Sequence, residues 1–279
     1  MYVRQADLPI RIAVLDMNNN TPNKGLGYIV KFIESYGDIF EYQIFDVRFK
    51  SEIPEVENFD AFISSGGPGS PFDGDGIWDI KWHNWLQEVW DYNKVNIVKK
   101  HVFLICHSFQ MACIHFKVGN VCERKNMSFG TYPAHKTHIG EHEPFFAALP
   151  EPFYIADFRH WQVIQPDKKQ IKSLGLKIVA IEKERPHVEL ERAIMAIRFS
   201  DTIFATQFHP EADAPGMLSY FQEEERKQQV ITEHGEKRLR DMIDHLGDPD
   251  KVELTGHTIL PAFFEDVIQS LKPSEALLA

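Results

Sequence analysis

The fold of this chain is decided by the stretch Val102-Phe103-Leu104-Ile105-Cys106-His107-Ser108-Phe109-Gln110, in which an apolar run leads directly to a cysteine. The run predicts a buried strand over 101–105, and the residues that follow predict a helix over 108–116. A turn of this kind lifts a nucleophile above the sheet, and the helix dipole favours the thiolate. Cys106 is therefore a candidate nucleophile, and its alternative is an inert cysteine of the core.

Strands and helices alternate on the N-terminal side of this stretch. Strands are predicted over 10–16, 41–47 and 61–64, and a helix over 25–36 has its apolar residues on one face. This alternation is typical of a parallel sheet that helices cover on both faces. We expect an α/β fold, a three-layer α/β/α sandwich with a mostly parallel central sheet, flavodoxin-like in the broad sense.

The C-terminal side is predicted to contain shorter strands and longer helices. Short strands and a hairpin are expected at 153–156, 162–164, 177–181, 193–198 and 203–207. Residues 214–245, rich in Glu, Lys, Gln and Arg, predict helix, and 261–271 predict a final helix.

A second apolar run ends in Ala205-Thr206-Gln207-Phe208-His209-Pro210-Glu211. Alternate residues of an extended segment point to the same side, so His209 and Glu211 can face one site. A thiol that attacks, an imidazole that accepts its proton and a carboxylate that orients the imidazole make up a nucleophilic triad. Sites in open α/β sheets form beyond the carboxyl ends of the strands, where Cys106 and His209 are both expected.

A glycine-rich loop, Ser64-Ser65-Gly66-Gly67-Pro68-Gly69-Ser70, follows the predicted strand 61–64. Glycines let the backbone approach a ligand closely and point its N–H groups at a developing negative charge. The spacing and the Lys-Ser/Thr of a phosphate loop are absent. The loop is therefore a candidate oxyanion hole, and its alternative is a plain turn.

Composition narrows the class of protein. The net charge is −11 and no long Lys/Arg run is present, which argues against a nucleic-acid partner. Three cysteines indicate a reducing compartment rather than a disulfide framework. The N-terminus lacks an apolar signal core, and no stretch is long enough to span a membrane. We expect a cytoplasmic protein with no membrane partner and no nucleotide or redox cofactor.

Together the motifs resemble the class I glutamine amidotransferases, including the glutaminase domain of GMP synthase, from Ile10 onward. That family has a Gly-Gly-Pro-Gly oxyanion loop, a cysteine elbow followed by a Gln, and a late His-Pro-Glu. The matching residues here are Gly66-Gly67-Pro68-Gly69, Cys106 with Gln110, and His209-Pro210-Glu211. The resemblance implies a catalytic Cys-His-Glu triad of Cys106, His209 and Glu211. It also implies an oxyanion hole formed by the backbone N–H groups of Gly67 and His107.

Further substrate-binding candidates come from the same resemblance. They are Gly66, Gln110, the segment Ser128, Phe129 and Gly130 that would lie beneath a bound glutamine, and His160, which matches the family's Ser-His segment. The stretch 258–264 is similar to the family's closing helix. We therefore expect a single domain of the family over 1–279, with a helical insertion over 213–256 before that helix.

The activity that the resemblance implies is that of a glutaminase-type hydrolase. It would cleave the γ-amide of glutamine, or of a γ-glutamyl compound, through a γ-glutamyl thioester. Three alternatives stay open. The chain is a transferase subunit that supplies ammonia to a separate synthetase, a stand-alone γ-glutamyl peptidase, or a binding protein that has lost turnover. Leu104 and Ser108 bear on the last, because they replace the glycines of the family's elbow.

Three other features have two interpretations each. His135, His138, Glu141 and His142 are closely spaced, but they fit no compact zinc pattern, so no metal site is predicted. Trp78, Trp82 and Trp85 recur at helical spacing and are expected in the core, or else along the substrate crevice. The charged residues 222–240 predict a solvated cover, or else a lid that docks a partner.

Overall fold

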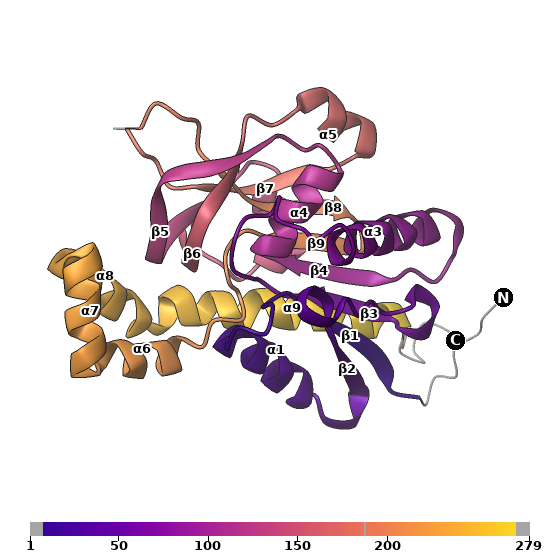
Figure 1. Ribbon diagram of the computed structural model, residues 1–279, viewed down its shortest axis with the longest axis horizontal. Helices are drawn as coiled ribbons and strands as arrows, with labels where there is room; N and C mark the ends of the chain where they lie inside the picture. Colours follow the sequence, from indigo (N-terminus) through magenta and orange to yellow (C-terminus); the bar gives the residue numbers. More distant parts are fainter. Residues whose placement is uncertain (1–7, 187, 272–279) are drawn as a thin grey trace.

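A nine-stranded sheet, in the order β2-β1-β3-β4-β9-β8-β7-β5-β6, organises the computed structural model, which describes residues 8–186 and 188–271 (Figure 1). The predicted domain 1–279 also includes 1–7, 187 and 272–279, which lie outside the described residues. The strands are β1 Ile10–Asp16, β2 Phe40–Asp46, β3 Ala61–Ser64, β4 His101–Ile105, β5 Asn120–Lys136, β6 Phe153–Ile164, β7 Lys177–Glu182, β8 Ile194–Ser200 and β9 Ile203–Thr206.

Helices cover both faces of this sheet. They are α1 Lys24–Glu34, α2 Val47–Lys50, α3 Trp78–Val95, α4 His107–His115, α5 Lys168–Leu174, α6 Ala214–Gln222, α7 Glu224–His234, α8 Glu236–Leu246 and α9 Leu254–Leu271. Single helical turns lie at Gly37–Ile39, Val56–Asn58, Gly140–His142, Pro144–Phe146 and Pro249–Glu253. None of the helices in the described ranges is both long and apolar enough to cross a membrane.

The expected three-layer α/β/α architecture is confirmed. Strands β2, β1, β3, β4 and β9 pair in parallel, while β8, β7, β5 and β6 extend the sheet with antiparallel pairs. Every residue of β3, β4 and β9 is buried. Strands that are buried on both faces read as continuous apolar runs, which explains why β3 and β4 begin and end where the sequence predicts.

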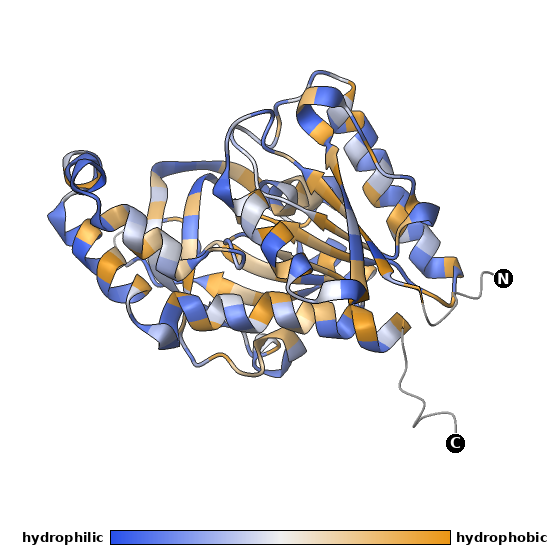
Figure 2. Ribbon diagram, turned by 90° about the horizontal axis from the view of Figure 1, so that it is seen from below, coloured by the Kyte–Doolittle hydropathy of each residue, from blue (hydrophilic) through white to orange (hydrophobic). Residues whose placement is uncertain are grey.

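Alternate residues along the strands build two separate cores. On one face Val14 and Phe103 pack with residues of α1 and α9, and on the other Leu15 and Leu104 pack with residues of α3 and α4. Apolar residues accordingly gather on the strands in Figure 2, while the helices show polar outer faces. Because both cores pack against β4, the strand that ends at Cys106 is fixed from two sides.

The tryptophan repeat belongs to one of these cores. Trp78, Trp82 and Trp85 are buried on α3 against the sheet, which confirms the prediction that they are core residues. Trp82 also donates a hydrogen bond from Nε1 to Ser64 Oγ at 3.1 Å. This bond ties α3 to the strand end from which the glycine-rich loop leaves.

The helical C-terminal part differs in detail from the prediction. Residues 214–245 are not one helix but three, α6 to α8, with breaks at Glu223 and at Gly235, whose φ of +87° favours glycine. These helices stand side by side at one end of the molecule (Figure 1). They form their own apolar cluster, in which Phe221 and Met242 pack near Phe129 and Phe158 of the β5–β6 hairpin. The three helices therefore cover one face of that hairpin.

Two further boundaries were predicted wrongly. The strands expected at 153–156 and 162–164 are parts of one strand, β6. The final helix begins at Leu254 rather than at Pro261, because this helix tolerates a proline in its interior. Proline is common at the first position of a helix, so the sequence pattern placed the start too late.

Candidate active site

Cys106 lies between β4 and α4 in a backbone conformation that few side chains adopt. Its φ is +48° and its ψ is −95°. Such a conformation costs about 1–3 kcal/mol and persists only where its surroundings hold it. Here Cys106 N donates to Thr206 O at 2.8 Å, and Gln110 N donates to Cys106 O at 3.0 Å. Neighbouring β9 and the first turn of α4 therefore fix the sharp turn, and the thiol is 5% exposed.

His209 and Glu211 follow β9, whose carboxyl end lies beside that of β4. His209 Nδ1 is 2.7 Å from Glu211 Oε1, and the carboxylate of Glu211 is 2% exposed. The backbone N–H of His209 donates to Ala156 O at 3.0 Å, which anchors this segment to β6. The hydrogen bond from Nδ1 leaves Nε2 as the ring nitrogen that is free to exchange a proton.

The imidazole of His209 is electrostatically coupled to both acidic groups. Burial lowers the pKa of His209, but the charges of Glu211 and of the Cys106 thiolate, and hydrogen bonds to both, raise it well above its ordinary value. A raised pKa favours the protonated imidazole over the neutral one at neutral pH. The site is therefore suited to hold a protonated imidazole beside the sulfur atom of Cys106.

The glycine-rich loop lies against the side chains of both Cys106 and His209. A Cβ atom on Gly66 would lie 2.9 Å from His209 Cε1 and 3.4 Å from Cys106 Cβ, so any larger residue would displace the imidazole. A Cβ atom on Gly67 would lie 2.2 Å from Met17 O. Arg48 holds the same loop, since its Nη1 donates to Met17 O and to Pro68 O. Both positions require glycine because neighbouring atoms lie too close to the backbone for a side chain to fit.

Ser108 connects the elbow to this loop. Its hydroxyl donates to Ser65 O at 2.8 Å and lies 2.7 Å from Ser64 Oγ, which in turn accepts from Trp82 Nε1. All these atoms are buried. The serine at the position of the family's elbow glycine therefore has hydrogen-bond partners, and Leu104 packs entirely within the core.

Replacing Ser108 by alanine is expected to destabilise the protein by about 1–3 kcal/mol, because it leaves the Ser65 carbonyl and the Ser64 hydroxyl buried with one partner fewer. The free energy of unfolding in urea measures this effect. Ser173→Ala on the exposed face of α5 is the control and is expected to change stability by less than about 0.5 kcal/mol. Equal stability of both variants would contradict a stabilising role for the hydrogen bonds of Ser108.

His107 occupies the first position of α4 with a buried side chain. It is 1% exposed, and neither ring nitrogen makes a hydrogen bond among the described residues. Burial lowers the pKa of His107 to about 3, with a further contribution from Arg48, so the ring is neutral at physiological pH. At the start of a helix its backbone N–H has no intrahelical acceptor. Its role in an oxyanion hole stays a prediction.

A cavity of about 540 Å³ opens beside these residues. Cys106, His209, Glu211 and Gly67 all line it. Most of the remaining wall comes from the loop before α1, from α1 and α6, and from Phe158 of β6. The triad candidates and one oxyanion candidate therefore share one ligand-sized space, as expected for an active site.

Comparison with known proteins identifies the family. The model of the class I glutamine amidotransferase family matches residues 28–221, which is more than half of the chain. The chain belongs to the class I glutamine amidotransferases. No curated protein matches this sequence.

Solved structures have the same fold at low identity. A glutamine amidotransferase from Thermotoga maritima is 13% identical with a TM-score of 0.63, covering 95% of this chain and 99% of that one. A putative GMP synthase subunit from Thermoplasma acidophilum is 19% identical with a TM-score of 0.51, covering 74% and 86%. The CTPS glutaminase domain of Trypanosoma brucei, with bound acivicin, is 16% identical with a TM-score of 0.53, covering 72% and 86%.

Gln110, at the family's Gln position, lies outside the cavity of this amidotransferase. Its amide is buried and donates to Gln207 Oε1 at 3.2 Å and to Trp161 O at 3.4 Å. Gln207 in turn donates from Nε2 to Cys106 Sγ at 3.7 Å. The sequence did not indicate Gln207 as a contact of the thiol. Its place two residues before His209 was the only signal that could have found it.

Apart from Gly66 in the glycine-rich loop, the other predicted substrate residues lie around the β5–β6 hairpin. Ser128 Oγ donates to Asp157 Oδ2 at 2.6 Å. Phe129 stacks on His234 of α7 with ring centroids 4.1 Å apart, and the helix α8 packs over Gly130. His160 is exposed. None of these residues lines the cavity beside Cys106, and their substrate-binding roles stay predictions.

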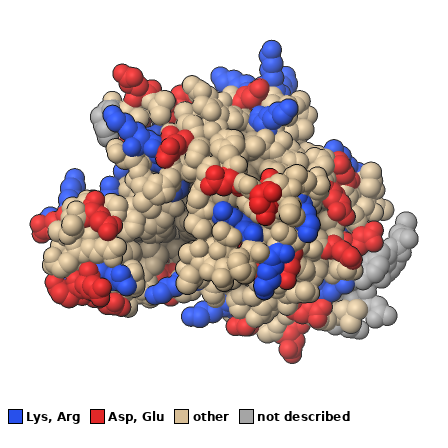
Figure 3. Space-filling model, viewed as in Figure 1, with Lys and Arg blue, Asp and Glu red and all other residues tan. Residues whose placement is uncertain are grey.

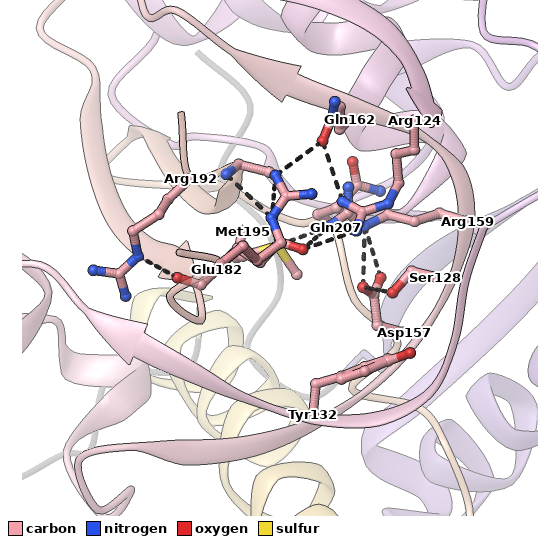
Figure 4. Close-up of polar contacts among 12 residues, drawn as sticks. Arg124, Ser128, Tyr132, Asp157, Arg159, Gln162, Glu182, Arg192, Met195 and Gln207 are labelled. Atoms are coloured by element: carbon pink, nitrogen blue, oxygen red, sulfur yellow. Dashed lines mark hydrogen bonds and ion pairs between the residues drawn. The ribbon is translucent and has the colours of Figure 1, made fainter. Parts of the chain in front are cut away.

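A second cavity of about 700 Å³, which the sequence did not reveal, is lined by Asp157 of β6 and by the charged residues Arg124, Glu182 and Arg185. Figure 4 shows how these charges pair, with Arg159 Nε 2.9 Å from Asp157 Oδ1. Glu182 on β7 accepts from Arg124 and Arg185, each at 3.0 Å. Burial lowers the pKa of Arg159, but these two carboxylates outweigh it and raise that pKa. The ion pairs tie β5, β6 and β7 together.

The histidine cluster shows no metal geometry. His135 Nδ1 is 2.6 Å from Glu151 Oε1, and His138 Nδ1 is 3.2 Å from Glu141 Oε2. Within residues 8–186 and 188–271, no group of three or more His, Cys, Asp and Glu side chains is arranged to hold a metal ion.

On the face shown in Figure 3, Lys and Arg are interspersed with Asp and Glu rather than gathered into a basic surface.

Proposed function

We propose that this class I glutamine amidotransferase hydrolyses the γ-amide of glutamine, or of a γ-glutamyl compound, through a γ-glutamyl thioester. The observation that carries the proposal is the cavity lined together by Cys106, His209, Glu211 and Gly67. The glutamine amidotransferase from Thermotoga maritima and the CTPS glutaminase domain with bound acivicin share the fold, which supports the same class of ligand.

In the first half of the reaction the Cys106 thiolate attacks the γ-carbonyl carbon, and a carbon–sulfur bond forms. The carbonyl oxygen becomes an oxyanion that accepts hydrogen bonds from the backbone N–H groups of Gly67 and His107. When the tetrahedral intermediate collapses, the carbon–nitrogen bond breaks. The protonated His209 gives its proton to the leaving nitrogen, while Glu211 keeps the imidazole in position.

In the second half a water molecule replaces the released amine. The imidazole of His209, now neutral, accepts a proton from this water as its oxygen attacks the thioester carbon. The carbon–sulfur bond breaks, glutamate leaves, and the thiolate and imidazolium are restored. The balance is one amide and one water consumed, with one glutamate and one amine or ammonia released.

Covalent labelling tests the proposal. Acivicin, a glutamine-mimicking electrophile, is expected to add to Cys106 and to raise the mass of the intact protein by one adduct. Cys106→Ala is expected to remain unlabelled, while Cys122→Ala, which removes a half-buried thiol on β5, is expected to label like the wild type. Labelling without any glutamate release would instead favour a binding protein that kept the site, and no labelling of Cys106 would reject the site.

Supply of the released ammonia to a separate synthetase is a second candidate function. The observation that favours it is the similarity in fold to a putative GMP synthase subunit. A rise in ammonia release from glutamine on adding the synthetase would support this role. Full activity on γ-glutamyl peptides in the absence of any partner would support a stand-alone hydrolase.

A further inference from the structure

The cavity beside Cys106 is far larger than the leaving group of glutamine requires. Ammonia needs about the 30 Å³ that one water molecule occupies in the liquid, whereas the cavity measures about 540 Å³. Its wall is rich in large apolar and aromatic residues, namely Tyr28, Phe158, Met217, Tyr220 and Phe221. A cavity of this size and lining is suited to an apolar group of many atoms.

The position of His209 decides which part of a substrate lies there. The leaving nitrogen must come within hydrogen-bond reach of the imidazole that protonates it. Because His209 is part of the cavity wall, a group attached to that nitrogen has room to extend into the cavity.

The charged groups of the cavity wall do not match those of the γ-glutamyl end of the substrate. A γ-glutamyl group carries an α-ammonium and an α-carboxylate, and both need partners when they leave water. The cavity wall contains one carboxylate, that of Glu211. Its Oε1 is bonded to His209 and its Oε2 is buried, so among the described residues no exposed carboxylate of this cavity is available to the α-ammonium. Lys24 is the lysine of the wall, with its Nζ 4.7 Å from the ring centroid of Tyr220.

We propose that the preferred leaving group is an amino acid with a large apolar or aromatic side chain, so that the substrates are γ-glutamyl dipeptides of the type γ-Glu-Phe. This inference rests on the proposed function of the site. The side chain of the leaving residue packs against Phe158, Tyr220 and Phe221, and its carboxylate faces Lys24. The bond that breaks is the γ-amide, and the nitrogen of the leaving amino acid takes the proton from His209.

Glutamate release from γ-Glu-Phe and from glutamine tests the inference. The kcat/KM for γ-Glu-Phe is expected to exceed that for glutamine by about tenfold or more, as is usual when an apolar group fills a matching pocket. Tyr220→Ala is expected to lower this ratio by about tenfold. Tyr42→Ala, at an exposed tyrosine of the edge strand β2, is the matched control and is expected to leave the ratio unchanged.

The role of Lys24 has its own comparison. The γ-glutamyl amide of phenethylamine has the aromatic ring of γ-Glu-Phe but no carboxylate on the leaving group. Lys24→Met is expected to lower the ratio of kcat/KM for γ-Glu-Phe over this amide by about tenfold. An unchanged ratio would overturn the pairing of Lys24 with the carboxylate.

The outcomes separate this inference from the proposed function. If glutamine is cleaved as efficiently as γ-Glu-Phe or more efficiently, the preference for an apolar leaving group is overturned. The glutaminase proposal is unaffected by that result. Failure of acivicin to label Cys106, with no glutamate released from any of the three compounds, overturns the proposed function and this inference with it.

Discussion

Replacing Cys106 by alanine is expected to lower the rate of glutamate release by at least about 10⁴-fold, since removal of the nucleophile of a triad costs this much or more. The substitution removes the sulfur atom of the cavity wall that is placed to form a thioester beside His209 and Gly67. Rates are measured as glutamate formed from glutamine and from γ-Glu-Phe under steady-state conditions.

Cys122→Ala controls for the loss of a thiol as such. Cys122 is half-buried on β5 and lies outside the catalytic cavity, so its removal is expected to leave kcat within about twofold of the wild type. Substantial glutamate release by Cys106→Ala, at a rate near that of the wild type, would refute thioester chemistry at this site.

Replacing Glu211 by glutamine is expected to lower kcat by about 10³–10⁴-fold, as loss of the carboxylate does in other triads. The amide has nearly the shape of the carboxylate, but it no longer stabilises the imidazolium. Its NH₂ group also favours the wrong tautomer of His209. Glu224→Gln, at the exposed start of α7, is the control with the same change of charge and is expected to keep full activity.

The pH profile of kcat gives an independent measure of the same effect. In the wild type, the negative charges of Glu211 and Cys106 outweigh burial and raise the pKa of His209, so the imidazolium persists to a higher pH. Removing the charge of Glu211 lowers the pKa of His209. The alkaline limb of the profile, where the proton for the leaving group is lost, is therefore expected to shift to lower pH. An unchanged limb in Glu211→Gln would contradict the coupling of these residues.

Cys106 and Glu211 could both be predicted from the sequence, because the patterns that indicate them lie in short stretches of neighbouring residues. The strand that ends at Cys106 is buried on both faces, so it appears as an unbroken apolar run that stops at the thiol. Parallel strands bring their carboxyl ends to one edge, so the segments after β3, β4 and β9 were expected to meet. Gly66 and Gly67 were predicted to permit close backbone approach, and the surrounding atoms leave no room for a side chain.

Other features depend on pairing that no local pattern contains. Strand β5 is largely polar and pairs irregularly with β6, with a shift of register between Glu123 and Ser128, so the sequence predicted no strand there. The break at Gly235 lies in a segment whose charged composition favours helix throughout. Glycine costs only about 1 kcal/mol in a helix, so the residue type alone did not identify the end of α7.

The sequence by itself determined the α/β layers, the strand that presents Cys106 and the segment that carries His209 and Glu211, because buried periodicity and strand ends are properties of neighbouring residues. Only the tertiary structure decided that Gln207 donates to the thiol from 101 positions away, and that aromatic residues of α1, β6 and α6 enclose the cavity. Contacts of that kind arise from how whole elements pack against one another, and packing depends on shape across the core rather than on any run along the chain.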